Sequence, residues 1–174
     1  MTKAFTCKCH RLKKTTCLIC IGIRLVRIMA DRVFWQKKAL SEMTTEEWES
    51  LCDGCGKCCL QKLEDDEDGT VYYTDVVCQY MTDECRCSIY PKRHETVPNC
   101  VWLKPEDVDQ FYWLPSTCAY RLLAEGRDLP LWHPLVSGDP QLIHAVNVSV
   151  NHMDLVPDNQ VPEEEWEDHI IDNV

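Results

Sequence analysis

The chain has 174 residues, which is enough for one domain and hardly for two. It carries 18 lysine and arginine residues against 29 aspartate and glutamate residues, and it contains 13 cysteines. The charge is uneven: residues 1–28 hold seven basic residues and no acidic one, which leaves 11 basic and 29 acidic residues, a net charge of −18, in residues 29–174. A surface this acidic does not neutralise phosphates, so nucleic acid is excluded as a partner of residues 29–174.

Residues 1–28 admit three interpretations. A secretory signal fits the basic start and the apolar run Cys17–Ile23, but Arg24 and Arg27 interrupt that run and no small-residue cleavage site follows. A transmembrane helix is excluded, because no apolar run approaches the ~20 residues that a membrane span needs. We favour the third interpretation over a basic tail: the natural start is Met29, and residues 1–28 are a disordered or non-native upstream extension. Four cysteines of this segment resemble a paired-thiol zinc pattern: Cys7, Cys9, Cys17 and Cys20.

Two helices are predicted before the first thiols of the remaining chain. Asp31–Met43 has apolar residues one turn apart on one side, which indicates a helix. Thr44 and Glu47 have the spacing of a capping box, so a second helix begins there. Its apolar stripe would run straight into the first thiols, through Trp48, Leu51, Cys52 and Cys55.

The stretch Leu51–Cys59 places four thiols within eight residues: Cys52, Cys55, Cys58 and Cys59. Two residues between thiols let a short loop turn both sulfurs toward one centre, as zinc knuckles and iron–sulfur loops require. Gly54 and Gly56 permit positive φ, so backbone amides can turn toward anionic sulfurs. Because Cys58 and Cys59 are adjacent, their side chains diverge, and one of them can face a second centre.

A second set of four thiols follows an acidic turn and a strand. Glu64–Gly69 is predicted to be a solvated hairpin turn rather than a calcium loop, since its end ligands are wrong for calcium. The β-branched run Thr70–Val77 predicts a strand. Cys78 comes at its end, followed by Cys85, Cys87 and Cys100. In an extended segment Cys85 and Cys87 would project to one side. How the two sets interleave cannot be derived from spacing.

The C-terminal half contributes packing elements. They are a short helix opened by Pro105, a helix over Ser116–Glu125, a half-buried strand over His144–Val150 and an amphipathic helix over Pro162–Ile171. We predict that Cys118 is buried as a small hydrophobe rather than a ligand. The histidines are expected to be surface or hydrogen-bonded core residues, and His133 is the one to test. The predicted fold is a small, single, metal-stapled α+β domain, residues 29–174, with short helices and few strands.

The thiol chemistry predicts a metal site in a reducing compartment. Nine cysteines in residues 29–174 are an odd number without a convincing export signal, which favours reduced thiolates in the cytoplasm over disulfides. The predicted metal ligands are Cys52, Cys55, Cys58, Cys59, Cys78, Cys85, Cys87 and Cys100. Zinc and an iron–sulfur cluster both accept four thiolates, so both remain open. Lys57, Lys62, Arg86 and Arg93 are candidates to offset the negative charge.

These motifs resemble the YkgJ-type CxxCxxCC cysteine-cluster family, a family of zinc- or iron-chelating domains, and within it the YcgN-like branch. The resemblance is carried by Cys52–Cys59, Cys78, the run Cys85–Arg93 and Cys100, and it continues in Thr117–Gly126 and Leu129–Leu135. It covers roughly residues 34–171 and implies metal chelation in a small bacterial cytoplasmic protein, without an established reaction. A metal or cluster protein is therefore expected; the alternatives are a cluster-dependent enzyme with one open metal site and a zinc-stapled interaction module.

Overall fold

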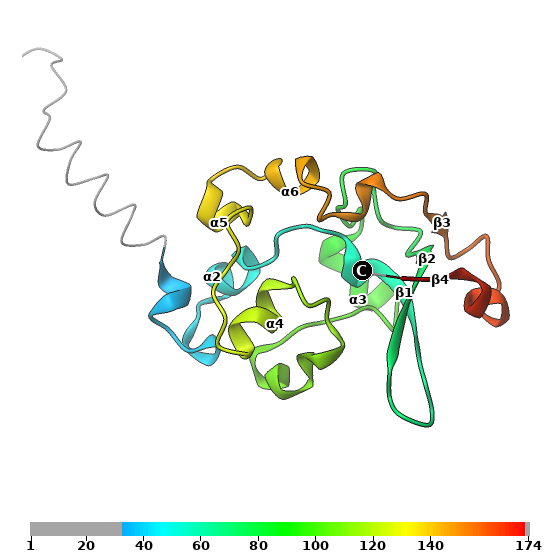
Figure 1. Cartoon of the computed structure of the whole chain (residues 1–174), viewed down its shortest axis with the longest axis horizontal. Coiled ribbons are helices and arrows are strands. Elements are labelled where there is room, and N and C mark those ends of the chain that lie inside the picture. The colour runs from blue at the N-terminus through cyan, green and yellow to red at the C-terminus, as the bar shows by residue number, and fades with distance from the viewer. Residues whose placement is uncertain (1–32, 173–174) are drawn as a thin grey trace, which may run out of the picture. The chain divides into compact units, whose positions relative to one another are not determined.

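The computed structural model describes residues 33–172 of the chain (Figure 1). The predictions made for residues 1–28, including their four-cysteine pattern, lie outside the described residues. The compact unit described below begins at Trp35. It combines short helices with a small sheet, which confirms the predicted α+β class. No helix within residues 33–172 has the length and apolar character needed to cross a membrane.

The helices are short. The α-helices are α2 (Thr45–Ser50), α3 (Arg93–Thr96), α4 (Ala119–Ala124), α5 (Pro134–Ser137) and α6 (Leu142–Ala145). Turns of 3₁₀-helix cover Phe34–Gln36, Leu40–Glu42, Lys57–Cys59, Tyr90–Lys92, Pro105–Trp113, Val150–His152 and Glu163–His169. Helices of this length gain most of their stability from tertiary packing.

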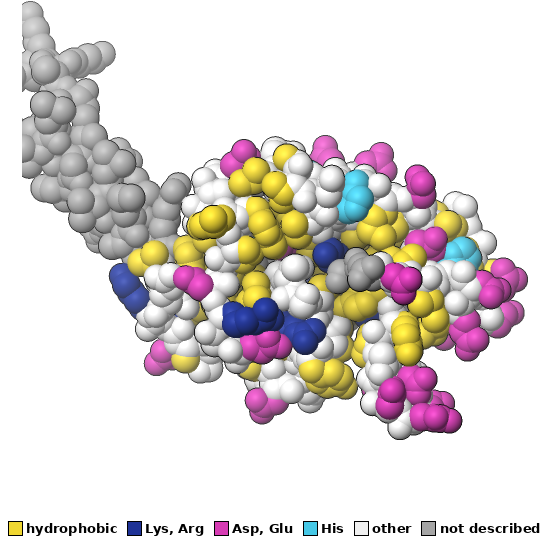
Figure 2. Space-filling model, viewed as in Figure 1, with side chains coloured by type: hydrophobic (Ala, Val, Ile, Leu, Met, Phe, Trp, Pro, Cys, Tyr) yellow, Lys and Arg dark blue, Asp and Glu magenta, His cyan; other side chains and the backbone are white. Residues whose placement is uncertain are grey.

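The sheet is built around one strand. Its strands are β1 (Leu60–Glu64), β2 (Val71–Val77), β3 (Val156–Pro157) and β4 (Ile170–Ile171). Strand β2 pairs antiparallel with β1 and β4, and parallel with β3. The predicted acidic turn joins β1 to β2, and Asp65 organises it by accepting hydrogen bonds from the amides of Glu67 and Asp68. Figure 2 shows acidic side chains gathered at the tip of this hairpin.

The core has two parts on either side of the thiols. Beside the sheet, Leu60, Val77, Cys85 and Val150 form one buried cluster. Beside α2, the Trp48 ring lies 4.7 Å from that of Tyr120, measured between centroids, and the indole donates to the Leu103 carbonyl at 3.1 Å. The Tyr120 hydroxyl donates to the Trp48 carbonyl at 2.9 Å. The α2–α4 contact therefore fixes the elements that precede and follow the thiol-rich segment.

The start of α2 confirms the predicted capping box. The Thr44 side chain accepts from the Glu47 amide at 3.2 Å, and the Glu47 carboxylate accepts from the Thr44 amide at 2.9 Å. The helix ends at Ser50, so the prediction that its stripe continues through Cys52 and Cys55 is wrong. Those thiols lie in the loop that follows the helix, in which Gly54 and Gly56 adopt positive φ.

Other element predictions need correction. Asp31–Met43 is not one helix: within its described part, two 3₁₀ turns flank Ala39, which is extended and donates its amide to Glu42. The predicted strand His144–Val150 is wrong, because α6 ends at Ala145 and Asn147 turns the chain with a φ of 57°. Helix α4 begins three residues later than predicted, because Cys118 is extended at its N-cap. The last predicted helix is a 3₁₀ segment followed by β4.

Candidate metal centre

The loop between α2 and β1 brings the first thiols together. The Asp53 carboxylate accepts a hydrogen bond from the Cys55 amide at 3.0 Å, which closes a turn between the first two cysteines. The Cys55 carbonyl accepts from the Val150 amide at 2.8 Å, and this bond fixes the loop to the core beside the sheet. The Cys59 carbonyl accepts from the Cys78 amide at 2.9 Å, so the end of β2 is fixed to the same loop.

Four thiols from two separate parts of the chain form what we call the first thiol group: Cys52, Cys55, Cys58 and Cys118. Burial raises the pKa of Cys118 to about 12, and Asp53 and Cys58 add to the rise. Surrounding protein likewise raises the pKa of Cys52 to about 12, with contributions from Cys58, Asp53 and Cys118, although the residue retains surface exposure. Burial also raises the pKa of Cys55, helped by Asp53 and Cys58. These thiols therefore lie within electrostatic reach of one another.

Four other cysteines form the second thiol group: Cys59, Cys78, Cys87 and Cys100. A hydrogen bond to Cys58 raises the pKa of Cys59, and burial and Cys78 raise it further. Burial raises the pKa of Cys78, with Cys87 contributing. Burial raises the pKa of Cys100; Arg93 opposes that rise, and Cys78 and Cys87 reinforce it. The second group is thus drawn from the loop, the end of β2 and the segment around α3.

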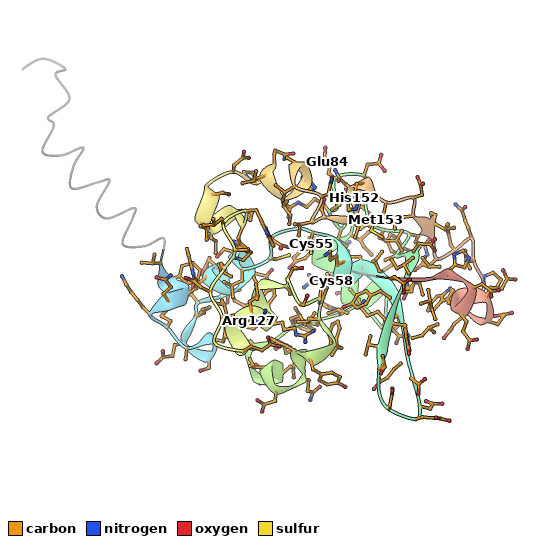
Figure 3. The ribbon with its side chains drawn as sticks, in the orientation of Figure 1. Cys55, Cys58, Glu84, Arg127, His152 and Met153 are labelled. Carbon is orange, nitrogen blue, oxygen red and sulfur yellow. The ribbon has the colours of Figure 1, made fainter. Side chains whose placement is uncertain are left out.

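The two groups meet at the adjacent Cys58 and Cys59, where Lys62 supplies a positive charge (Figure 3 labels Cys55 and Cys58). Lys62 donates to the carbonyls of Cys58 and Leu60, at 3.0 and 2.6 Å. The hydrogen bond from Cys59 lowers the pKa of Cys58 to about 7, and the Lys62 ammonium contributes. Burial lowers the pKa of Lys62, while both thiols oppose that shift. Of the predicted charge-offsetting residues, Lys62 thus acts on both groups and Arg93 on the second.

Cys85 has a different environment. It is 7% exposed, packs in the cluster with Leu60, Val77 and Val150, and adopts a φ of 55°. Because this backbone is not extended, the expectation that Cys85 and Cys87 project to one side does not hold. Burial raises the pKa of Cys85, and the amides of Val150 and Asn151 and the Arg86 guanidinium oppose that rise; no second thiol within residues 33–172 adds to it. Ligation by Cys85 stays a prediction.

Cys118, which the sequence predicts to be a buried small hydrophobe, belongs to the first group. Its position follows from the α2–α4 contact, since Cys118 is the N-cap of α4. Its side chain makes no capping hydrogen bond, although the amides of Arg121 and Tyr120 partly oppose the rise of its pKa. Amide contacts of this kind favour the thiolate, which is the form of cysteine that binds a metal.

A buried carboxylate and a buried histidine adjoin the first group. Asp53 is 6% exposed, and its Oδ2 has no hydrogen-bond partner. His133 is fully buried: its Nδ1 accepts from the Leu135 amide at 3.1 Å, so its Nε2 carries the proton and donates to the Leu51 carbonyl at 3.1 Å. Both ring nitrogens of His133 are thus occupied, as expected for a core histidine. Asp53 was not predicted as a site residue; the one signal for it in the sequence is its position between two cysteines of a CxxC unit.

The donor chemistry fits a metal, although the side chains do not form a preformed cage. Among residues 33–172, no group of three or more histidine, cysteine, aspartate or glutamate side chains is arranged to hold a metal ion. The thiols nevertheless gather in two groups, and the Oδ2 atom of Asp53 is buried without a partner. A cation with affinity for sulfur, such as zinc or iron, relieves both the repulsion between thiolates and the unpaired carboxylate.

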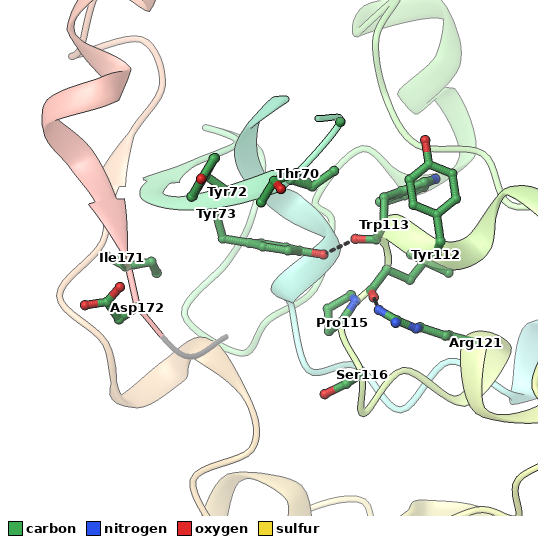
Figure 4. A pocket seen from close by; sticks show the side chains of 13 residues that line it. Thr70, Tyr72, Tyr73, Tyr112, Trp113, Pro115, Ser116, Arg121, Ile171 and Asp172 are labelled. Atoms are coloured by element: carbon green, nitrogen blue, oxygen red, sulfur yellow. Dashed lines mark hydrogen bonds between the residues drawn. The ribbon is translucent and has the colours of Figure 1, made fainter. Parts of the chain in front are cut away.

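A separate groove of about 540 Å³ lies between the hairpin and the Pro105–Trp113 segment (Figure 4). The Tyr73 hydroxyl crosses it and donates to the Trp113 carbonyl at 2.6 Å. Arg121 is engaged by the Leu114 carbonyl and by Glu125. The lining mixes aromatic, hydroxyl-bearing and aliphatic side chains with Arg121 and Asp172, and it contains no cysteine, so the groove is distinct from the thiol groups.

Comparisons with known proteins match the part of the chain that holds the thiols. A family model named CxxCxxCC and described as "Putative zinc- or iron-chelating domain" matches residues 51–119, which include Cys118. A UPF0260 protein of Marinobacter nauticus is 57% identical over 83% of this chain and 97% of its own length. UPF0260 proteins of Ectopseudomonas mendocina and Azotobacter vinelandii are each 55% identical, over 79% and 82% of this chain and 93% and 97% of their own lengths. No solved structure matches.

Proposed function

Because this chain belongs to the UPF0260 family and its residues 51–119 match the CxxCxxCC family model, we propose that it binds zinc or iron through two sites of four thiolates each. The observation that supports the proposal is that eight of the nine cysteines of residues 33–172 act on one another's pKa values, in two sets joined through Cys58. The proposed ligands are Cys52, Cys55, Cys58 and Cys118 in the first site and Cys59, Cys78, Cys87 and Cys100 in the second.

Electrostatics support a bound cation at each site. Four thiolates held together repel one another, and a bound metal ion displaces their protons and cancels that repulsion. A four-thiolate zinc site still carries a net charge of about −2. Lys62, at the junction of the groups, and Arg93, near Cys100, are suited to offset this remaining charge.

The proposed role is non-catalytic: storing, delivering or sensing metal, or carrying electrons. Each group offers four thiols, the number that fills a structural zinc site or a cluster site, whereas a catalytic zinc site keeps one position open. The cytoplasm is the compartment that suits this chemistry, since reduced thiols are needed to bind the metal.

Anaerobic purification followed by metal and sulfide analysis and a visible spectrum tests the proposal. Broad visible absorption with iron and acid-labile sulfide selects clusters. A colourless protein with two equivalents of zinc selects mononuclear zinc sites. Reduced protein that is folded but contains neither metal contradicts the proposal.

Three alanine variants test the ligand assignment with one kind of substitution. Cys55→Ala and Cys118→Ala are expected to lose the metal of the first site, because each removes one of its four thiolates. Cys85→Ala is the matched control: it also removes a buried thiol but is expected to retain the full metal load. A full metal load in Cys118→Ala would show that Cys118 is not a ligand. Loss of metal in Cys85→Ala would show that Cys85 is one.

A further inference from the structure

Asp53 lies within the first thiol group and is only partly explained by the fold. Its Oδ1 accepts the Cys55 amide, which accounts for the turn. Its Oδ2 is buried without a partner, and the residue is 6% exposed. Burying a carboxylate oxygen is costly unless a hydrogen bond or a cation compensates for the lost water. No group within residues 33–172 donates a hydrogen bond to the Oδ2 atom, so this compensation is missing there.

Lys62 and His133 are engaged elsewhere, and the Arg86 guanidinium, which lies against Gly54, makes no hydrogen bond to the Oδ2 atom of Asp53. The Lys62 ammonium donates to two backbone carbonyls and acts on Cys58 and Cys59. The protonated nitrogen of His133 donates to the Leu51 carbonyl, and its other nitrogen accepts from the Leu135 amide. By contrast, Asp53 acts electrostatically on every thiol of the first group: Cys52, Cys55, Cys58 and Cys118.

We propose that Asp53 is an oxygen ligand of the metal ion at the first site, contributing its Oδ2 atom alongside the thiolates. The inference rests on the proposed function, because it concerns the metal held by the first thiol group. It gives the two sites different chemistry: the second binds through sulfur alone, whereas the first has both sulfur and oxygen donors.

The test compares Asp53→Asn with Asp139→Asn in the full-length, reduced chain reconstituted with zinc alone. In the Asp53→Asn variant the amide oxygen of the new side chain can still accept the Cys55 amide, but the anionic oxygen is lost. Asp139 is a matched control, because its carboxylate accepts the Gln141 amide at 2.9 Å in the same i to i+2 turn on the exposed surface. X-ray absorption at the zinc edge reports the ligand atoms, since zinc–sulfur distances are about 2.3 Å and zinc–oxygen distances about 2.0–2.2 Å.

Wild type and D139N are expected to show an oxygen shell in addition to sulfur, and D53N to lose it. Chelator competition should show at least a ~10-fold weaker zinc affinity at one of the two sites in D53N. A sulfur-only shell in wild type, or an oxygen shell that persists in D53N, overturns the inference, as does unchanged zinc affinity. If D53N does not fold, Asp53→Ser provides a second variant, because its hydroxyl can accept the same turn hydrogen bond. Failure of the wild-type chain to bind zinc or iron would instead refute the proposed function.

Discussion

Replacing Gly56 by alanine tests whether the thiol loop is held rigidly against the core. Gly56 lies between Cys55 and Lys57 with a φ of 78°. A methyl group there would approach Val150 Cγ2 to 2.7 Å, Met81 Sδ to 3.1 Å and Cys85 Cβ to 3.3 Å. Val150 cannot easily move, because it is fully buried and its amide is bonded to the Cys55 carbonyl.

Two costs add in the Gly56→Ala variant. A non-glycine residue in the left-handed region costs roughly 1–2 kcal/mol. Overpacking a buried contact costs roughly 1–3 kcal/mol more. The expected loss in the free energy of unfolding is therefore about 2–5 kcal/mol, a large part of the ~5–15 kcal/mol typical of a domain. Displacement of the loop should also weaken metal binding at the first site.

Urea denaturation of metal-saturated protein measures the effect, with Gly126→Ala as the control. Gly126 has a similar φ of 70°, but an added methyl group there meets no atom within 4 Å. Gly126→Ala should therefore show only the backbone cost of roughly 1–2 kcal/mol. Equal destabilisation by the two substitutions would refute the conclusion that the loop packs tightly on Val150.

Three further substitutions probe the scaffold around the thiols. Thr44→Ala removes the side-chain half of the capping box and should lower the free energy of unfolding by about 1 kcal/mol in urea titrations, whereas an unchanged midpoint would contradict the cap. Tyr120→Phe removes the hydroxyl that donates to the Trp48 carbonyl and should cost roughly 1 kcal/mol in the same assay, and no loss would mean that this bond adds nothing to the α2–α4 contact. Burial lowers the pKa of His133 in the folded chain. At a pH between this lowered pKa and that of a free histidine, the unfolded chain is therefore protonated at His133 and the folded chain is not. Stability should thus fall as pH decreases below about 6.5, until the pH passes the folded-state pKa. In His133→Gln this pH dependence should be weaker; an identical pH profile would contradict the role given to burial.

Local sequence signals predicted the elements that depend on neighbouring residues. The capping box at Thr44 and the acidic hairpin turn are confirmed because each is closed by hydrogen bonds within a few residues. Strand β2 is confirmed because its β-branched and aromatic residues suit a half-buried sheet. The alternation over His144–Val150 was misleading, because Val150 is buried against the thiol loop while Val146 is 45% exposed after the end of α6.

The site depends on contacts that a linear pattern does not contain. Cys118 reaches the first group only because α4 packs on α2, a contact between residues 72 positions apart. Cys85 has a left-handed backbone conformation and is buried in the core. No adjacent glycine or proline in the sequence predicts that conformation. The CxxC spacing alone does not predict a role for Asp53, because the turn that its carboxylate closes depends on the loop conformation.

Elemental analysis of the reduced protein, purified without oxygen, tests the central claim most directly when it is combined with unfolding before and after chelation. The account predicts bound zinc or iron and a marked loss of thermal stability once that metal is removed, because the two thiol groups join the loop, the end of β2 and α4. A protein that is free of both metals as isolated, and equally stable with and without a chelator, would contradict it.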